Sequence, residues 1–212
     1  MILEIDSITL KRSNRVLFAN FSLNVNKSQI IIFTGDNGVG KSSLLEAISG
    51  VLKVHKGKIK KSENAQNVFY IGHENCLKED LSVFDNLKIW CDTSRLKVDS
   101  KKIFEGLKSF NMTELIYQSV KKLSQGQKRR VALTKLFFTN SPLILLDEPL
   151  SGLDMKSENN FLKIIDNKRE LGKTIILSSH NNLKLENHML INLNNYTSNI
   201  KPTNKPNSWE SL

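Results

Sequence analysis

The feature that most constrains the fold of this chain is a glycine-rich octapeptide between a short apolar run and a helical pattern. Residues 30–34 read Ile-Ile-Ile-Phe-Thr, which is typical of a parallel strand buried on both faces. Helical periodicity follows from Lys41 to about Leu52. The intervening octapeptide matches G-x-x-x-x-G-K-[ST] in full: Gly35, Asp36, Asn37, Gly38, Val39, Gly40, Lys41 and Ser42. Strand, loop and helix in this order predict a phosphate-binding loop.

The chemistry of this loop suits a nucleoside triphosphate bound with Mg²⁺. Its glycines let the backbone turn so that successive N–H groups face phosphate oxygens, and the following helix adds its positive N-terminal end. Lys41 is predicted to contact the β- and γ-phosphates, and the hydroxyl of Ser42 to ligate Mg²⁺. Ser43 is assigned to the same nucleotide site.

A second apolar run ends in two carboxylates. Residues 143–146 read Leu-Ile-Leu-Leu, and Asp147 and Glu148 follow directly. At a strand end, Asp147 is placed to hold Mg²⁺ and Glu148 to face an attacking water. The pattern is weak alone, but together with the loop at residues 35–42 it predicts a triphosphate-hydrolysing site.

The remaining pattern predicts an α/β protein with a parallel sheet. Further strands are expected at residues 1–10, 21–25, 68–71, 174–177 and 189–193, and a helix at about 125–139. Residues 78–122 are polar with helical periodicity, which predicts a helical insert. Strands alternating with helices indicate parallel pairing.

Composition narrows the functional class. The chain has 212 residues, enough for one domain, and no run approaches 18 apolar residues, so no membrane span is predicted. The start shows no secretory signal, and two cysteines cannot form a disulfide framework. The net charge of +10 permits nucleic acid, an anionic membrane surface or a polyphosphate ligand, but most of the excess is lysine. A nucleic-acid partner is therefore not expected.

Five motifs in a fixed order resemble the ATPase subunits of ABC transporters over residues 2–193. They are the phosphate loop, Leu-Ser-x-Gly-Gln at 123–127, Leu-Leu-Asp-Glu-Pro at 145–149, Ser-Gly-Leu-Asp at 151–154, and His180 after an apolar strand. The resemblance implies a P-loop NTPase fold with a RecA-like parallel core sheet, an N-terminal antiparallel β subdomain and a helical insert at about 73–122. One ATPase domain is expected at 1–194, followed by a polar tail at 195–212.

The same resemblance implies the roles of several residues. Glu148, His180 and Lys41 are the expected catalytic residues, and ATP with Mg²⁺ the expected ligands. The family works as a head-to-tail dimer, in which Ser124, Gly126 and Gln127 of one subunit grip the ATP bound to the other. Asp154 is expected to tie the two sites together.

A narrower resemblance points to the CcmA-type ATPases of cytochrome c maturation. It rests on residues 70–73 (Tyr-Ile-Gly-His), 77–87 and 123–136. It implies an ATP-binding subunit of a haem exporter, with a CcmB-type permease and other Ccm proteins as partners. The chain would be peripheral on the cytoplasmic face of an inner membrane, or on the matrix side in an organelle. Whether haem itself moves, or a haem-loaded chaperone is released, stays open.

Two positions depart from the general ABC pattern. His73 stands where most members have a glutamine that senses Mg²⁺, and the CcmA-type group tends to have histidine. His73 is therefore a candidate metal ligand beside Ser42 and Asp147, although imidazole suits Mg²⁺ poorly. Residues 11–15 lack the aromatic side chain that usually stacks on adenine, and Arg12 is the candidate replacement.

Other functions remain open. The chain could serve another small ABC transporter, for a metal, vitamin or lipid, or act as a non-transport ABC assembly ATPase. A nucleic-acid-associated ATPase is supported only by the net charge. Chromosome-maintenance ATPases are disfavoured because no heptad run lies between Ser42 and Leu123.

Overall fold

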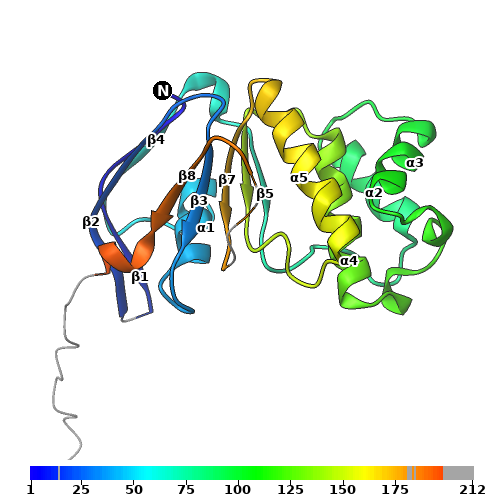
Figure 1. Ribbon diagram of the computed structural model, residues 1–212, viewed down its shortest axis with the longest axis horizontal. Coiled ribbons are helices and arrows are strands. Elements are labelled where there is room, and N and C mark those ends of the chain that lie inside the picture. The colour runs from blue at the N-terminus through cyan, green and yellow to red at the C-terminus, as the bar shows by residue number, and fades with distance from the viewer. Residues whose placement is uncertain (14, 181–182, 184, 198–212) are drawn as a thin grey trace, which may run out of the picture.

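The core of the molecule is a five-stranded parallel sheet, whose strands run side by side through the centre of Figure 1. The computed structural model describes residues 1–13, 15–180, 183 and 185–197. The strand order is β5-β6-β7-β3-β8, and all four pairings are parallel. This confirms the predicted α/β class. The strands are β3 (Ile30–Thr34), β5 (Val68–Ile71), β6 (Leu143–Leu146), β7 (Thr174–Ser178) and β8 (His188–Asn192).

A three-stranded antiparallel sheet confirms the predicted N-terminal β subdomain. Its order is β2-β1-β4, with β1 at Leu3–Arg12, β2 at Arg15–Val25 and β4 at Lys56–Lys61. The strand β4 was not predicted, because its sequence Lys-Gly-Lys-Ile-Lys-Lys contains one apolar residue. Ile59 pairs with Ile5 of β1, so tertiary pairing rather than local pattern defines this strand.

The helix α1 (Lys41–Ser49) lies between the two sheets and contacts β1, β5, β6 and β7. It ends earlier than the predicted Leu52, because the N–H of Gly50 donates to the carbonyls of Glu46 and Ala47 and closes the last turn. Apart from Glu46 and its two half-buried serines, the whole helix is buried. The start of α1 is thereby held rigidly at the sheet edge.

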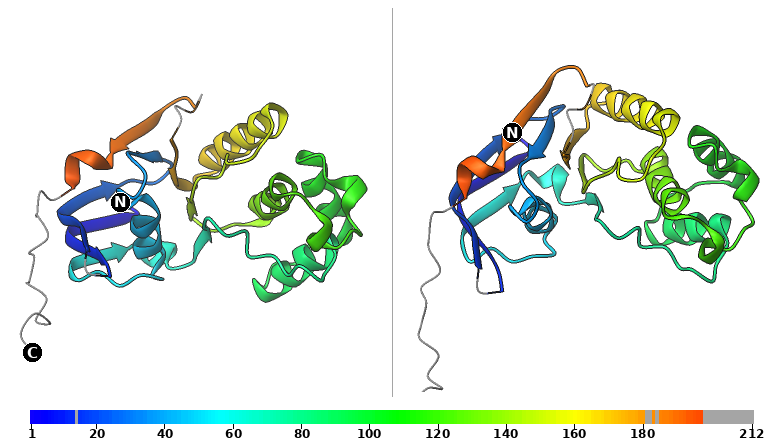
Figure 2. Two further views of the ribbon diagram at one scale, coloured as in Figure 1. Left: turned by 90° about the horizontal axis from the view of Figure 1, so that it is seen from below. Right: turned by 60° about the horizontal axis from the view of Figure 1, so that its bottom comes forward.

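Helices cover the other face of the parallel sheet and extend into a lobe at one end (Figures 1 and 2). The helix α4 (Gln125–Phe138) agrees with prediction, and the polar stretch 78–122 contains α2 (Val83–Thr93) and α3 (Ser100–Ser109) as expected for a helical insert. The helix α5 (Met155–Glu170) was not predicted. Its buried stripe is only Phe161, Leu162 and Ile165, with polar residues between.

Two hydrophobic cores meet at the parallel sheet, and β3 contributes to both. Ile30 and Ile32 face the core shared with the helical lobe, whereas Ile31 and Phe33 face the core shared with α1 and the antiparallel sheet. All four side chains have no exposed surface. The continuous apolar run of β3 follows directly from burial on both faces.

The C-terminal part that the structure describes packs back on the antiparallel sheet. A 3₁₀ turn at Leu193–Tyr196 follows β8, and the ring of Tyr196 meets that of Phe21 at 5.0 Å. The predicted tail begins at residue 195, and its residues 198–212 lie outside the described part. Within the described part, none of the helices combines the length and apolar character needed to cross a bilayer.

Candidate functional site

The glycine-rich loop joins β3 to α1 with its backbone in unusual conformations. Gly35, Gly38 and Gly40 have φ of 135°, 77° and 116°. A Cβ on Gly40 would lie 2.9 Å from the ring of Phe18, so any side chain there would clash. Gly40 caps α1 without a side-chain hydrogen bond, and the first turn of α1 has no acidic residue. The positive end of α1 is therefore available to an anion.

Lys41 folds back over this loop. Its ammonium donates hydrogen bonds to the carbonyls of Gly35 (2.9 Å) and Asp36 (3.2 Å), and the side chain is 5% exposed. Burial lowers the pKa of Lys41, while the nearby carboxylates of Glu148, Asp147 and Asp36 oppose this shift. Within the described residues none of these carboxylates forms an ion pair with Lys41, and a phosphate would supply that direct anionic contact.

The carboxylates that follow β6 are held by the end of β7. The hydroxyl of Ser178 donates to Asp147 at 2.6 Å and accepts from the backbone N–H of Glu148 at 2.8 Å. Asp147 is 1% exposed. One serine hydroxyl thus orients the first carboxylate and positions the backbone of the second.

Glu148 and His180 form a pair. The Nε2 atom of His180 lies 2.8 Å from Oε1 of Glu148, with both side chains partly exposed. Glu148 has φ of 45°, a left-handed conformation that costs a non-glycine residue about 1 kcal/mol or more. Such strain persists only where surrounding contacts enforce it. The strained backbone aims the Glu148 carboxylate at His180.

A cavity of about 220 Å³ brings the predicted phosphate site together with Glu148. Asp147 directly precedes Glu148 in the chain and is not itself among the lining residues. Its carboxylate and the Ser42 hydroxyl supply the oxygen ligands that Mg²⁺ prefers. These two residues would hold the ion, with remaining positions left to phosphate oxygens and water. The cavity is lined by Arg12, Leu17, Asn37, Gly38, Gly40, Lys41, Ser42, Ser43 and Glu148.

Arg12 stands at the rim of this cavity and is tethered on one edge. Its Nη1 donates to Ser43 Oγ at 3.1 Å and to Glu46 Oε2 at 3.0 Å. The side chain is 60% exposed, so its planar face is open to solvent beside the phosphate loop.

His73 lies outside the Lys41 cavity. It is exposed and lines a larger hollow of about 610 Å³ together with Glu148, Arg129 and Gly152. Within the described residues His73 makes no hydrogen bond, and no cluster of three or more His, Cys, Asp or Glu side chains could hold a metal. The structure therefore places His73 in the lining of the same hollow as Glu148, and Ser42 is not part of that lining.

Ser124 and Gln127 form a capping box at the start of α4. The Ser124 hydroxyl accepts from the N–H of Gln127 at 3.2 Å, and the Gln127 side chain accepts from the N–H of Ser124 at 2.8 Å. Ser124 is exposed and is not among the residues lining the Lys41 cavity. A Cβ on Gly126 would lie 2.5 Å from the carbonyl of Gly152, so glycine is required by this close approach.

Asp154 caps α5. One of its oxygens accepts from the N–H of Ser157 at 2.8 Å, and the other pairs with Arg130 at 2.6 Å. The hydrogen bonds from Ser157, followed by the charge of Arg130, hold the pKa of Asp154 below its usual range. Its contacts in this chain are structural ones at the surface.

Two functional contacts were missed in the sequence. Ser178 appeared only as part of an apolar strand, although a hydroxyl at a strand end beside His180 was a usable signal. Asn194 accepts from the N–H of Asp36 at 3.1 Å, which ties the turn after β8 to the phosphate loop. No local pattern marked Asn194, because 158 residues separate the two partners.

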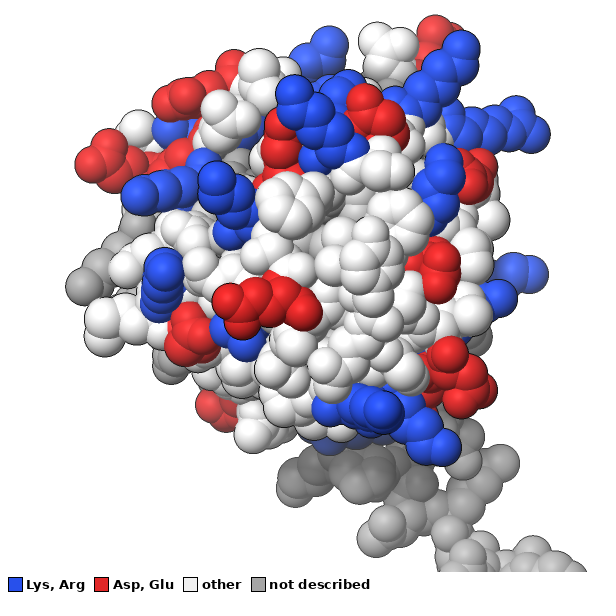
Figure 3. Space-filling view, turned by 90° about the vertical axis from the view of Figure 1, so that its right-hand side faces the viewer, with Lys and Arg blue, Asp and Glu red and all other residues white. Residues whose placement is uncertain are grey.

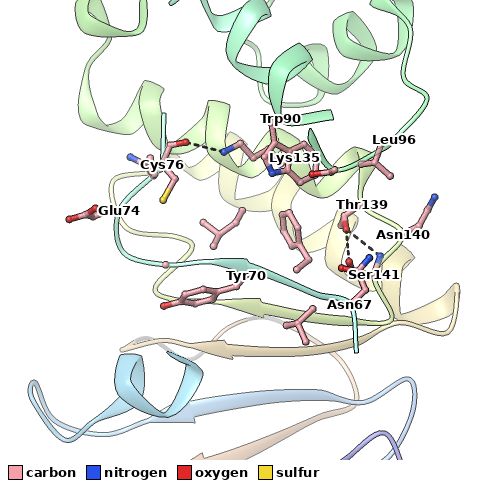
Figure 4. A pocket seen from close by; sticks show the side chains of 16 residues that line it. Asn67, Tyr70, Glu74, Cys76, Trp90, Leu96, Lys135, Thr139, Asn140 and Ser141 are labelled. Atoms are coloured by element: carbon pink, nitrogen blue, oxygen red, sulfur yellow. Dashed lines mark hydrogen bonds between the residues drawn. The ribbon is translucent and has the colours of Figure 1, made fainter. Parts of the chain in front are cut away.

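A hollow of about 470 Å³ runs along β5, the edge strand, and holds none of the predicted site residues (Figure 4). Trp90 of α2 and Lys135 of α4 line it, with the ammonium 5.9 Å from the Trp90 ring. Lys135 donates to the carbonyl of Cys76 at 3.4 Å. The hollow is lined by residues of the parallel sheet on one side and of the helices α2 and α4 on the other.

Comparison with known proteins agrees with the geometry. The family model described as "ABC transporter" matches residues 18–151. A cytochrome c biogenesis ATP-binding export protein CcmA from Vibrio cholerae is 29% identical over 198 residues, covering 89% of this chain and 96% of the relative. The CcmA of Brucella abortus is 33% identical over 192 residues, covering 88% of each.

Solved structures share the fold. A putative ABC transporter ATP-binding protein from Pyrococcus furiosus superposes with a TM-score of 0.82 at 27% identity, covering 93% of this chain and 100% of that one. An ATP-binding cassette solved as a dimer with ADP and phosphate gives a TM-score of 0.75 at 21% identity, covering 85% and 88%. This second likeness concerns the fold alone.

Proposed function

The chain belongs to the ABC transporter family as an ATP-binding subunit, and from this premise we propose that it hydrolyses ATP to drive a membrane permease in c-type cytochrome biogenesis. The observation that supports hydrolysis most directly is the Glu148–His180 pair at 2.8 Å, with Glu148 on the wall of the cavity that holds Lys41. The names of the CcmA relatives support the biological role.

The proposed reaction rests on positioning and charge neutralisation. The loop N–H groups, the α1 N-terminus and Lys41 bind the β- and γ-phosphates. Bound Mg²⁺, held by Ser42 and Asp147, would neutralise charge on the phosphate oxygens. Glu148 accepts a proton from the attacking water. The oxygen of that water bonds to the γ-phosphorus, and the bond between the γ-phosphorus and the ADP oxygen breaks. His180 holds the Glu148 carboxylate in line.

A second copy of the chain is proposed to complete each site. Ser124 is exposed at the start of a 14-residue helix and does not reach the Lys41 cavity of its own chain. In a head-to-tail pair, Ser124 and the α4 N-terminus of one copy would meet the γ-phosphate bound to the other.

The helical lobe is the proposed contact with the permease. Its outer face has an uncharged central area bordered by charged side chains (Figure 3). Exposed apolar residues of the lobe include Ile89, Phe104 and Tyr117, the last 80% exposed. A contiguous uncharged area that carries exposed apolar side chains is typical of an interaction site. The chain would then be a peripheral membrane protein on the cytoplasmic or matrix face, without a nucleic-acid partner.

Isolation of the membrane partner tests this role. The tagged chain, extracted from native membranes in mild detergent, is expected to co-purify with a CcmB-type permease. Tyr117→Ser should weaken that association. The control is Leu171→Ser: Leu171 caps the C-terminal end of α5 and is 64% exposed, and its replacement should leave the association intact. Recovery of a different permease would favour the rival transporters. A chain that remained in the soluble fraction with no membrane partner would favour the assembly ATPase.

Base selectivity is expected to be low, because residues 11–15 provide no aromatic platform and we propose Arg12 as the base contact. A guanidinium plane can stack on any purine. The residues that line the cavity give no reason to expect a side chain that recognises adenine by hydrogen bonds. The kcat/KM for GTP is expected within about tenfold of that for ATP. Arg12→Ala should weaken the binding of both ATP and GTP, whereas Arg15→Ala should leave the binding of both unchanged. A preference for ATP above about 100-fold would contradict this expectation.

A further inference from the structure

One buried arginine joins the start of the helical insert to the residues around Glu148. Arg129 lies in the second turn of α4 and is 5% exposed. Its Nη1 donates to the carbonyl of Gly72 (2.9 Å) and to Oδ1 of Asn75 (3.2 Å). Its Nη2 and Nε donate to the carbonyls of Asp147 and Pro149. All three nitrogens of the guanidinium are therefore used.

The carbonyls of Asp147 and Pro149, which accept from Arg129, belong to the residues immediately before and after Glu148. Glu148 adopts its left-handed φ of 45° between them, and Ser178 holds its N–H. A strained residue needs more than one enforcing contact. Arg129 and Ser178 together fasten the backbone immediately before, at and after Glu148.

The other two acceptors of Arg129 are the carbonyl of Gly72 and Oδ1 of Asn75. Both belong to the segment that leads from β5 into the insert. The strands β5 and β6 are parallel neighbours, and the N–H of Asp147 donates to the carbonyl of Ile71 at 2.8 Å. The carboxyl ends of both strands therefore lie side by side, and Arg129 bridges them from the helix α4, which begins at Gln125. One side chain links the insert, α4 and the backbone of the catalytic carboxylate.

Burying the guanidinium of Arg129 away from water costs free energy, which argues against an incidental arrangement. Burial lowers the pKa of Arg129, although the charges of Asp147 and Glu148 oppose this. Within the described residues no carboxylate forms an ion pair with Arg129, so backbone oxygens satisfy its donors. Lysine could keep the charge but not the planar fork that reaches both segments.

We propose that Arg129 is a positioning residue that holds Glu148 in its hydrolytic orientation and ties that orientation to the segment Gly72–Asn75 of the insert. This rests on the proposed ATPase function. Movement of the insert against the sheet changes the geometry of the carbonyls on either side of Glu148. ATP binding itself does not depend on Arg129, because Arg129 does not line the cavity around Lys41.

Steady-state kinetics with Arg129→Lys tests the proposal in the full-length chain. The expected result is a kcat reduced by about tenfold or more, with the dissociation constant for ATP within about twofold of the parent. The matched control is Arg169→Lys on α5, which removes a half-buried arginine paired with Asp166 at 3.5 Å. It should keep the parental kcat. A folded Arg129→Lys variant with unchanged kcat, or with kcat and ATP affinity falling together, would overturn the proposal.

A milder variant covers the case in which Arg129→Lys does not fold. Asn75→Ala removes only one side-chain acceptor and is expected to lower kcat by about threefold without changing ATP affinity. Asn67→Ala, at an exposed position before β5, is its control. An unchanged kcat for Asn75→Ala would then refute the link. If the parent chain hydrolyses no ATP, the proposed function fails instead, so the two failures are distinguishable.

Discussion

Replacing Glu148 with glutamine is expected to reduce ATP turnover by at least about 100-fold while ATP binding is retained. Glutamine keeps the shape of the side chain and its contact with His180, which lies 2.8 Å from the carboxylate. An amide cannot accept the proton of the attacking water. Lys41 and the loop amides, which hold the phosphates, are unaffected.

Turnover and binding must be measured separately. Phosphate release gives kcat, and equilibrium titration with ATP and Mg²⁺ gives the dissociation constant. Glu63→Gln, an exposed carboxylate in a short 3₁₀ turn, is the control for loss of a negative charge. Normal hydrolysis by Glu148→Gln would remove Glu148 from the role of general base.

Replacing Lys41 with alanine is expected to weaken ATP binding itself, by about 100-fold. Lys41 is 5% exposed and its ammonium bonds two carbonyls of the phosphate loop, where phosphate oxygens are expected to bind. Burial already lowers the pKa of Lys41, which means that the empty protein gains little from the charge. The folded state should therefore tolerate the substitution.

Thermal unfolding with and without nucleotide separates these effects. A ligand at 100 times its dissociation constant stabilises the native state by about 2.7 kcal/mol. At an ATP concentration of 100 times the parental dissociation constant, the melting temperature of the parent chain should rise clearly, whereas Lys41→Ala should gain only about 0.4 kcal/mol and shift little. Lys53→Ala, an exposed position after α1, should behave like the parent. An ATP-induced shift of parental size in Lys41→Ala would disprove the assignment.

The parallel core could be predicted because its strands are buried on both faces. Such strands read as continuous apolar runs, as β3, β6 and β7 do, and the pattern survives without knowledge of neighbours. The strand β4 and the helix α5 could not be found this way. Lys56–Lys61 has one apolar residue, and α5 buries a narrow stripe among polar side chains.

The candidate site was predicted through residues that chemistry restricts to a few types. A phosphate loop needs glycine, lysine and serine at fixed spacing, and a carboxylate pair must follow a buried strand. The cooperating groups Ser178, Asn194 and Arg129 have no such signature. Each contacts a partner that is distant in the chain.

The order of the motifs determined by itself that this chain is an α/β protein with a phosphate loop and a carboxylate strand end, because local spacing sets which backbone and side-chain groups can surround a phosphate. Only the tertiary structure decided which groups meet. It placed His180 against Glu148, left His73 apart from Ser42, and set Arg129 across the two strand ends. Those contacts depend on parallel strands ending at one edge, which sequence separation conceals.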